Sequence, residues 1–195
     1  MRRTHILFFV IGLAVSIIAV GGVATLVQVM THENARLTEV HAEAEAGNAE
    51  AQAIIGAFYT EGYGGLPQDY SEAIYWLRLS ADQGNALGQA GLAFIYSNGL
   101  GVLQDYEEAL YWNRLAADQG QADAQYNLGV AYYNGEGVPR DVVLAYTWYN
   151  LAAAQDIEEA RENRDKLARI MSFEQINEAQ RRSKEIQAKI TSKAN

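Results

Sequence analysis

Apolar residues between positions 47 and 155 recur at spacings of three and four, which places them on one face of an α-helix. Each such run is followed by a glycine-rich stretch and by a second run with the same spacing. The first run contains a small residue and, three positions later, a tyrosine; these pairs are Gly56 and Tyr59, Ala93 and Tyr96, and Gly129 and Tyr132. The pattern predicts three helical hairpins, in which the small residue lets a neighbouring helix come close.

The hairpins repeat with a period of 36 residues, which is the interval between Trp76, Trp112 and Trp148. The three copies are residues 47–83, 84–119 and 120–155, the first with one extra residue in its loop. A fixed period of this length indicates a repeat array in which each copy is one supersecondary unit. We expect the three tryptophans to form a core ladder between stacked hairpins.

Each second helix has a marked start and end. Asp69, Asp105 and Asp141 are expected to cap these helices, and in the first two copies a glutamate three residues later completes a capping box. In the third copy, Leu144 replaces that acid. A glycine is expected to end the first two of these helices in a left-handed conformation, whereas the third copy has Asp156 at that position.

The recurring positions together give the pattern A-x-x-x-L-G-x-x-Y-x-x-G-x-G-V-x-x-D-x-x-x-A-x-x-W-x-x-x-A-A-x-x-G. This pattern resembles the Sel-one-like repeat family, whose members are relatives of tetratricopeptide repeats. Copy three fits it best, copy two departs with Ala93 in place of the glycine, and copy one departs with its extra residue and Ile55. The signature positions are Gly56, Tyr59, Trp76, Tyr96, Trp112, Gly129, Tyr132 and Trp148. The resemblance covers 109 of the 195 residues and implies a right-handed α-solenoid that serves as a scaffold or adaptor.

The segments on either side of the repeats are predicted to be capping helices, because an open end of a solenoid would expose apolar surface. Residues 34–46 align with the second half of a repeat and predict an N-terminal capping helix. Residues 156–195 predict C-terminal capping helices, the last of which begins at an S-x-x-Q capping box that starts at Ser172.

Residues 6–30 predict a membrane anchor. The 24 residues from Ile6 to Val29 carry no charge and exceed the ~20 residues that an α-helix needs to cross a bilayer. Arg2 and Arg3 favour a cytoplasmic location for residues 1–5. We therefore expect an all-α fold preceded by a single-pass helix in the cytoplasmic (inner) membrane, with the repeats on the extracytoplasmic, periplasmic side. The alternative is a cleavable signal, although its apolar core would exceed the ~7–15 residues of such signals.

Charge is distributed unevenly along the chain. Residues 47–155 hold 12 acidic and 3 basic side chains, whereas residues 156–195 hold 8 and 9. An acidic repeat body argues against nucleic acid as a partner, because nucleic-acid binding requires a basic surface. The chain has no cysteine, which excludes disulfides and thiolate metal sites.

The sequence contains no recognisable set of catalytic residues. His5, His32 and His41 lie outside the repeats, and metalloprotease, phosphate-loop and nucleophile-elbow motifs are absent. Neighbouring carboxylates such as Glu107 and Glu108 point about 100° apart on a helix, so they do not converge on one substrate. We therefore expect no enzymatic activity, no catalytic residue, no cofactor and no metal.

In the related tetratricopeptide arrays, the first helix of each hairpin lines the concave face. Carried over by alignment, the resemblance implies an apolar and aromatic strip that suits an extended peptide or a helix of a protein partner. The implied residues are Glu50, Ala57, Thr60, Leu87, Phe94, Ser97, Asp123, Tyr126, Val130 and Tyr133. The alternative is that the C-terminal capping helix covers this strip.

These expectations point to a membrane-anchored extracytoplasmic scaffold or adaptor, acting in a cell-envelope complex. Two other functions stay open at this stage. Aromatic faces can stack on sugars, which suits a protein that binds glycan or peptidoglycan or hydrolyses it, although no convergent acid pair or nucleophile–base set is present. Cleavage of the N-terminal segment would instead produce a secreted repeat effector.

Overall fold

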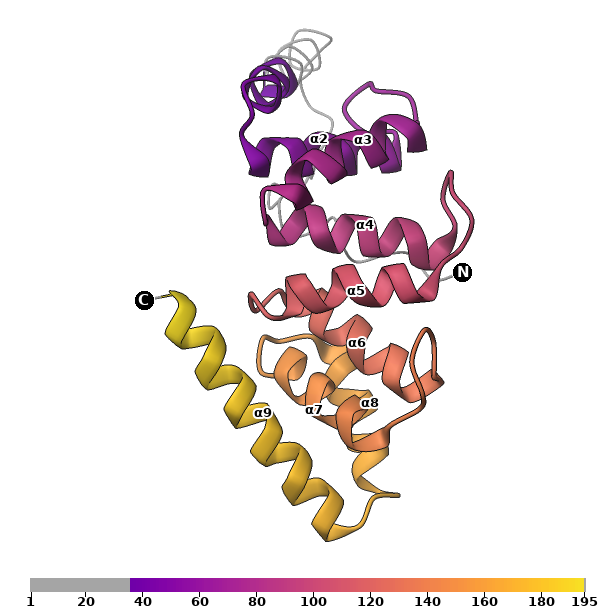
Figure 1. The fold of residues 1–195 in the computed structure, drawn as a ribbon, viewed down its shortest axis with the longest axis vertical. Coiled ribbons are helices and arrows are strands. Elements are labelled where there is room, and N and C mark those ends of the chain that lie inside the picture. The colour runs from indigo at the N-terminus through magenta and orange to yellow at the C-terminus, as the bar shows by residue number, and fades with distance from the viewer. Residues whose placement is uncertain (1–35, 195) are drawn as a thin grey trace, which may run out of the picture.

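The computed structural model describes residues 36–194, which form paired helices stacked into a solenoid (Figure 1). Repeat 1 consists of α2 (Ala49–Glu61) and α3 (Tyr70–Asp82), repeat 2 of α4 (Ala86–Asn98) and α5 (Tyr106–Ala117), and repeat 3 of α6 (Ala122–Asn134) and α7 (Val142–Ala153). A helix over residues 36–45 precedes the repeats, and α8 (Glu158–Ala168) and α9 (Phe173–Ala194) follow them. This part of the chain contains no strand, and the predicted all-α solenoid is confirmed.

Several predicted segments at the N-terminus lie outside the described residues. They are the cytoplasmic segment 1–5, the transmembrane helix 6–30 and the first two residues of the capping segment 34–46. Within residues 36–194, no helix combines the length and the apolar character that crossing a bilayer requires.

An aspartate joins the two helices of every hairpin. Its carboxylate accepts hydrogen bonds from the first turn of the second helix, as Asp69 does from the N–H groups of Ser71 (2.9 Å) and Glu72 (3.1 Å). The backbone N–H of Asp69 donates to the carbonyl of Tyr59 in the first helix (2.9 Å). The equivalent bonds run from Asp105 to Tyr96 and from Asp141 to Tyr132. In a capping box this N–H would donate to the glutamate side chain. Here it donates to the first helix of the hairpin instead, so the predicted bond to the glutamate is replaced by a bond between the two helices.

Residue size is matched across the two helices of a hairpin. A Cβ atom at Gly56 would lie 2.6 Å from Cγ of Leu77, and a Cβ atom at Gly129 would lie 2.4 Å from Cδ1 of Tyr149. Both distances are far shorter than a van der Waals contact, and closely packed interiors have little space for an added carbon. Glycine is therefore required where the facing helix carries a bulky side chain.

We predict that Gly129→Ala lowers the free energy of unfolding by about 1–3 kcal/mol, because the added methyl group collides with Tyr149. In repeat 2 the equivalent positions hold a larger residue facing a smaller one, Ala93 and Asn113. The double variant Gly129→Ala/Tyr149→Asn copies that pair, and it should lose less stability than the sum of its two single changes. Denaturant titration followed by circular dichroism measures all three variants, and strictly additive losses would contradict the steric explanation.

A buried glutamine on the first helix of each repeat hydrogen-bonds to a glutamine that follows the second helix. Gln125 on α6 is fully buried, and its Nε2 donates to the carbonyl of Ala117 at the end of α5 (3.3 Å). Its Oε1 accepts a hydrogen bond from Nε2 of Gln155, just after α7 (2.9 Å). The same glutamine pair occurs as Gln83 with Gln52 and as Gln119 with Gln89. Because a buried amide without partners is costly, this ladder favours one alignment of the helix ends.

Replacing Gln125 by leucine should therefore reduce the free energy of unfolding by about 1–3 kcal/mol, since the carbonyl of Ala117 loses its buried donor. Gln187→Leu is the matched control, because Gln187 is exposed on α9, and its effect should stay within about 0.5 kcal/mol. Equal stability changes in the two variants, measured by thermal or chemical unfolding, would show that the ladder is dispensable.

Candidate binding surfaces

The predicted strip falls on the first helices of the three hairpins, α2, α4 and α6. Glu50, Leu87 and Tyr133 are exposed there. The partly buried members are Ala57, Phe94, Ser97, Asp123, Tyr126 and Val130. Thr60 is buried, and its hydroxyl donates to the carbonyl of Gly56 (2.9 Å), so its side chain is not available to a partner. The other nine predicted residues retain accessible surface.

Three further residues of these helices reach the surface beside the predicted ones. Ile54, Gly91 and Asn127 are partly buried and occupy equivalent positions, one helical turn after the first predicted residue of each helix. Residues four apart share a helix face, so Ile54 and Asn127 widen the strip, whereas a Cβ at Gly91 would point at Leu77 of α3. The alignment with tetratricopeptide arrays did not include them, because it followed only one line of residues along each helix. Their recurrence at one repeat position is the signal that could have identified them.

The strip ends in a cluster of tyrosines on repeat 3. The rings of Tyr126 and Tyr149 lie 5.8 Å apart, and the guanidinium of Arg140 lies 5.3 Å from the ring centre of Tyr133. Burial raises the pKa of the Tyr149 phenol far above its ordinary value, and the neighbouring Tyr126 adds to the rise. Tyr149 therefore stays neutral and hydrogen-bonds to Asn163 of α8. The accessible members of the cluster, Tyr126 and Tyr133, provide aromatic surface that suits binding.

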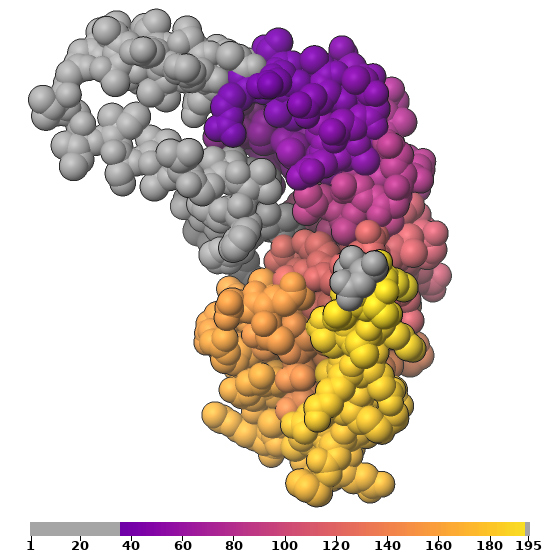
Figure 2. All heavy atoms as spheres, turned by 90° about the vertical axis from the view of Figure 1, so that its left-hand side faces the viewer, coloured from indigo at the N-terminus to yellow at the C-terminus, as the bar shows by residue number. Residues whose placement is uncertain are grey.

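The C-terminal helix α9 packs against α7, and Figure 2 shows it as a ridge along one side of the last repeats. Thr147 of α7 is fully buried; its hydroxyl donates to the carbonyl of Val143 in the same helix (2.7 Å) and lies 3.4 Å from the carbonyl of Ala179 on α9. The hydroxyl of Ser183 on α9 lies 3.2 Å from the carbonyl of Thr147. The equivalents of Thr147 in repeats 1 and 2 are Tyr75 and Tyr111, which are 56% and 55% exposed. On repeat 3, α9 thus covers a face that is open on the other two repeats.

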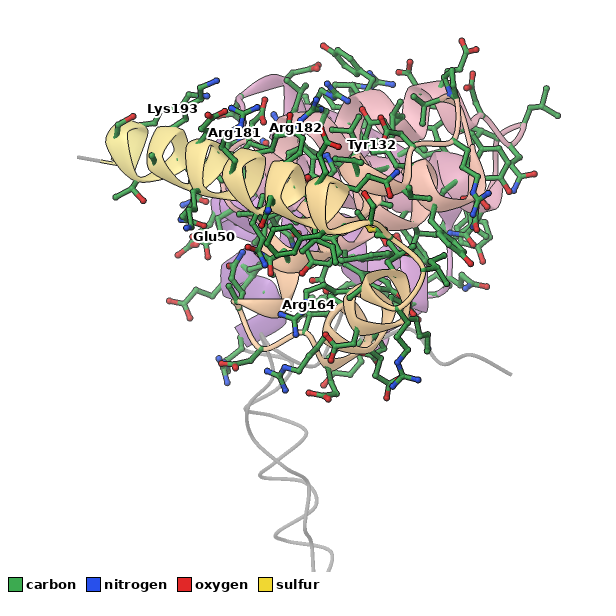
Figure 3. All side chains as sticks on the ribbon, turned by 90° about the horizontal axis from the view of Figure 1, so that it is seen from below. Glu50, Tyr132, Arg164, Arg181, Arg182 and Lys193 are labelled. Atoms are coloured by element: carbon green, nitrogen blue, oxygen red, sulfur yellow. The ribbon has the colours of Figure 1, made fainter. Side chains whose placement is uncertain are left out.

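The sequence of α7 explains why α9 packs on repeat 3. The first turn of α7 carries Val143 and Leu144, where the first turn of α5 carries Glu107 and Glu108. Apolar side chains at these positions favour the burial of a covering helix, whereas two carboxylates would have to be desolvated. Helix α7, on which α9 packs, carries no residue of the predicted strip. In the view along the solenoid, Glu50 of the strip and Tyr132 lie on opposite sides of α9 (Figure 3).

The part of the chain that the structure describes contains no group of three or more histidine, aspartate or glutamate side chains placed to hold a metal ion. The ring of His41 instead meets the ring of Trp76 edge-on, with 5.5 Å between ring centres, and its Nδ1 lies 3.3 Å from Oε1 of Glu45. His41 therefore packs at the N-terminal end of the solenoid. His5 and His32 lie outside the described residues.

Comparison with known proteins identifies the repeats and several relatives. The model of the Sel1 repeat family matches residues 49–85, 86–121 and 122–157. Among curated proteins, the chain is similar to the ERAD-associated E3 ubiquitin-protein ligase component HRD3A of Arabidopsis thaliana, with 37% identity over 59 residues. That match covers 30% of this chain and 9% of the plant protein, so the chain spans only a small part of that relative.

Two solved structures share the fold. A Sel1 repeat protein from Oxalobacter formigenes is 40% identical and superposes with a TM-score of 0.60, over 67% of this chain and 98% of that one. A protective antigen present in uropathogenic Escherichia coli strains, which displays an SLR fold, is 28% identical with a TM-score of 0.54. The second match covers 81% of this chain and 42% of the antigen.

We predict that Ala179→Arg displaces α9, because Ala179 is fully buried and an arginine cannot be accommodated there. Hydrogen exchange of the full-length protein, followed by mass spectrometry, should become faster in α9 and α7, while α4 keeps its wild-type rate. Ala188→Arg places the same residue at an exposed position of α9 and should change neither. Faster exchange in α4 of the Ala179→Arg variant would mean that α9 covers the strip after all.

Proposed function

Because this chain belongs to the Sel1 repeat family, we propose that it is a non-catalytic scaffold that binds a protein partner along the strip on α2, α4 and α6. The observation that carries this proposal is the position of α9, which packs on α7 and leaves the apolar and aromatic strip accessible. A strip of this kind suits an extended peptide or an amphipathic helix, which offers anchors at regular spacings.

The chemistry of the strip indicates the kind of segment that fits it. Phe94 and Val130 are partly buried apolar side chains on neighbouring repeats, and they can receive the regularly spaced apolar side chains of a peptide or helix. Asp123 lies on the same helix as Val130, and Glu50 lies on α2, so the strip also carries negative charge. A partner segment with apolar anchors and flanking lysines or arginines would match both features.

The plant relative supports an assembly role of a general kind. It is described as a component of a ubiquitin-protein ligase, and it shares a 59-residue match with this chain. We carry over only the idea that such repeats serve inside a larger complex, because the match covers 9% of that protein.

We propose further that residues 6–30 anchor the protein in the cytoplasmic membrane, with the repeats on the extracytoplasmic side in a cell-envelope complex. The support is the uncharged apolar run from Ile6 to Val29 and the two arginines before it. Five residues, 31–35, separate this segment from the helix over residues 36–45. Even fully extended, they reach only about 18 Å, which would hold the solenoid close to the bilayer.

Photo-crosslinking in cells tests the binding site directly. A photoreactive amino acid at position 94 or 130 of the full-length protein should trap one discrete protein, which mass spectrometry then identifies. The control position is Leu103, which is 90% exposed in the loop between α4 and α5 and outside the strip. The probe at position 103 should not trap that protein.

Charge substitutions provide the second half of this test. Phe94→Glu and Val130→Glu should each abolish recovery of the trapped protein, because an apolar interface cannot desolvate a carboxylate cheaply. Circular dichroism must show that both variants remain helical. Leu103→Glu makes the same charge change and should leave recovery intact. Full recovery with both strip variants would rule out the strip as the binding site.

A further inference from the structure

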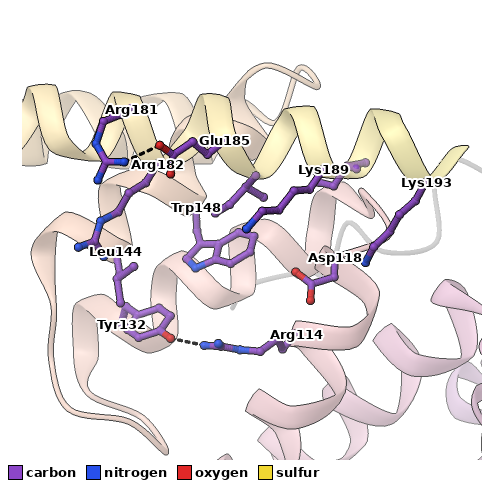
Figure 4. A pocket seen from close by; sticks show the side chains of 12 residues that line it. Arg114, Asp118, Tyr132, Leu144, Trp148, Arg181, Arg182, Glu185, Lys189 and Lys193 are labelled. Atoms are coloured by element: carbon purple, nitrogen blue, oxygen red, sulfur yellow. Dashed lines mark hydrogen bonds and ion pairs between the residues drawn. The ribbon is translucent and has the colours of Figure 1, made fainter. Parts of the chain in front are cut away.

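A pocket of about 550 Å³ opens between the C-terminal half of α9 and repeats 2 and 3 (Figure 4). Its basic lining residues are Arg114, Arg181, Arg182, Lys189 and Lys193, and its acidic ones are Asp118 and Glu185. Arg114 is one of only 3 basic residues in the repeats, which hold 12 acidic ones. The pocket therefore reverses the charge that prevails over the rest of the solenoid.

Two of the five cations are already neutralised within α9. Arg181 donates to Glu178 (2.8 Å) and to Glu185 (2.5 Å), and Arg182 donates to Glu178 (2.7 Å). The bonds from Arg182 and Arg181 lower the pKa of the Glu178 carboxyl below its ordinary value, so this group stays ionised and paired. Arg181 and Arg182 therefore line the pocket but contribute little net positive charge to it.

The charges of the other three cations are only partly compensated. Lys189 and Lys193 form no ion pair with any residue that the structure describes. Arg114 donates to the hydroxyl of Tyr132 instead of a carboxylate, and its guanidinium lies 5.9 Å from the centre of that ring. Figure 4 shows Asp118 at the same end of the pocket as Lys193, where its carboxylate partly offsets the positive charge.

Apolar side chains complete the pocket. Leu144 and Trp148 of α7 line it on one side, and Ile186 and Ile190 of α9 line it on the other. An apolar floor below a cationic rim fits a segment that carries carboxylates together with apolar side chains. A nucleic acid would use the rim alone, and its remaining phosphates would run onto the acidic repeats.

We propose that this pocket binds an acidic, partly apolar segment of a partner protein. Its carboxylates pair with Lys189, Lys193 and Arg114, and its apolar side chains pack on Leu144, Ile186 and Ile190, which keep accessible surface. This site is separate from the strip on α2, α4 and α6, so the failure of either proposal leaves the other standing.

Fluorescence polarisation with the full-length protein tests the proposal. The probe is a short fluorescein-labelled peptide in which pairs of glutamates alternate with leucine, and added salt should weaken its binding. The double variant Lys189→Glu/Lys193→Glu should weaken binding at least roughly tenfold, because two attractive charges become repulsive. The matched control is Lys166→Glu/Lys184→Glu, which changes the net charge equally at exposed positions outside the pocket, and it should alter binding less than about twofold.

A variant that should bind more tightly provides a further test, because misfolding would not increase affinity. Asp118→Asn removes the carboxylate that competes for the lysines, so it should strengthen binding of the same peptide by about two- to threefold. Unchanged or weaker binding by this variant would contradict the proposed role of the rim charges.

Three other results would overturn the proposal. One is equal binding of a peptide in which glutamine replaces every glutamate, and another is an equal loss of affinity in the Lys166→Glu/Lys184→Glu control. The third is tighter binding of a short RNA or of anionic lipid vesicles that depends on Lys189 and Lys193, because it would assign the pocket to another class of ligand. Circular dichroism of each variant establishes that the fold is intact.

Discussion

The contact between the second helix of one repeat and the first helix of the next is the constraint on which the rest of the structure depends. A single hairpin cannot bury its apolar residues alone. A Cβ atom at Gly91 of α4 would lie 2.4 Å from Cδ2 of Leu77 on α3. The side chain of Leu77 therefore packs directly against the backbone of α4. Arg78 of α3 then lies 5.0 Å from the ring centre of Trp112 and donates to the hydroxyl of Tyr96 (2.8 Å). Steric contact and hydrogen bonding together set the distance and the angle between consecutive hairpins.

The two proposed binding surfaces are what this stacking leaves uncovered. The first helices contribute only part of their surface to the stack and present the remainder as the strip. The outer faces of the second helices are also free, and α9 covers that face on α7, where Thr147 replaces the exposed Tyr75 and Tyr111. The C-terminal half of α9 extends beyond this contact, which creates the basic pocket against repeats 2 and 3. One array can therefore offer an acidic and apolar face and a separate basic one.

The repeat period was sufficient to predict the hairpins because each local signal, including the aspartate caps, recurs in register. The glutamine ladder could not be predicted, because glutamine is usually exposed and the partner of Gln125 is 30 residues away in sequence. The absence of a glycine at position 156 indicated that the pattern degrades there, yet Asp156 adopts a φ of 64°, the left-handed conformation also seen at Gly84 and Gly120. Aspartate tolerates that conformation better than most residues. The position of α9 depends on tertiary packing, so the sequence left two alternatives open.

The central claim is that a rigidly stacked array presents its first helices to a protein partner. Hydrogen exchange of the full-length protein, measured with and without the partner recovered by crosslinking, tests this claim most directly. The account predicts slower exchange in α4 and α6 when the partner binds, with α3 and α5 unchanged. Protection concentrated on the exposed faces of α3 and α5, with α4 and α6 at their free rates, would contradict it.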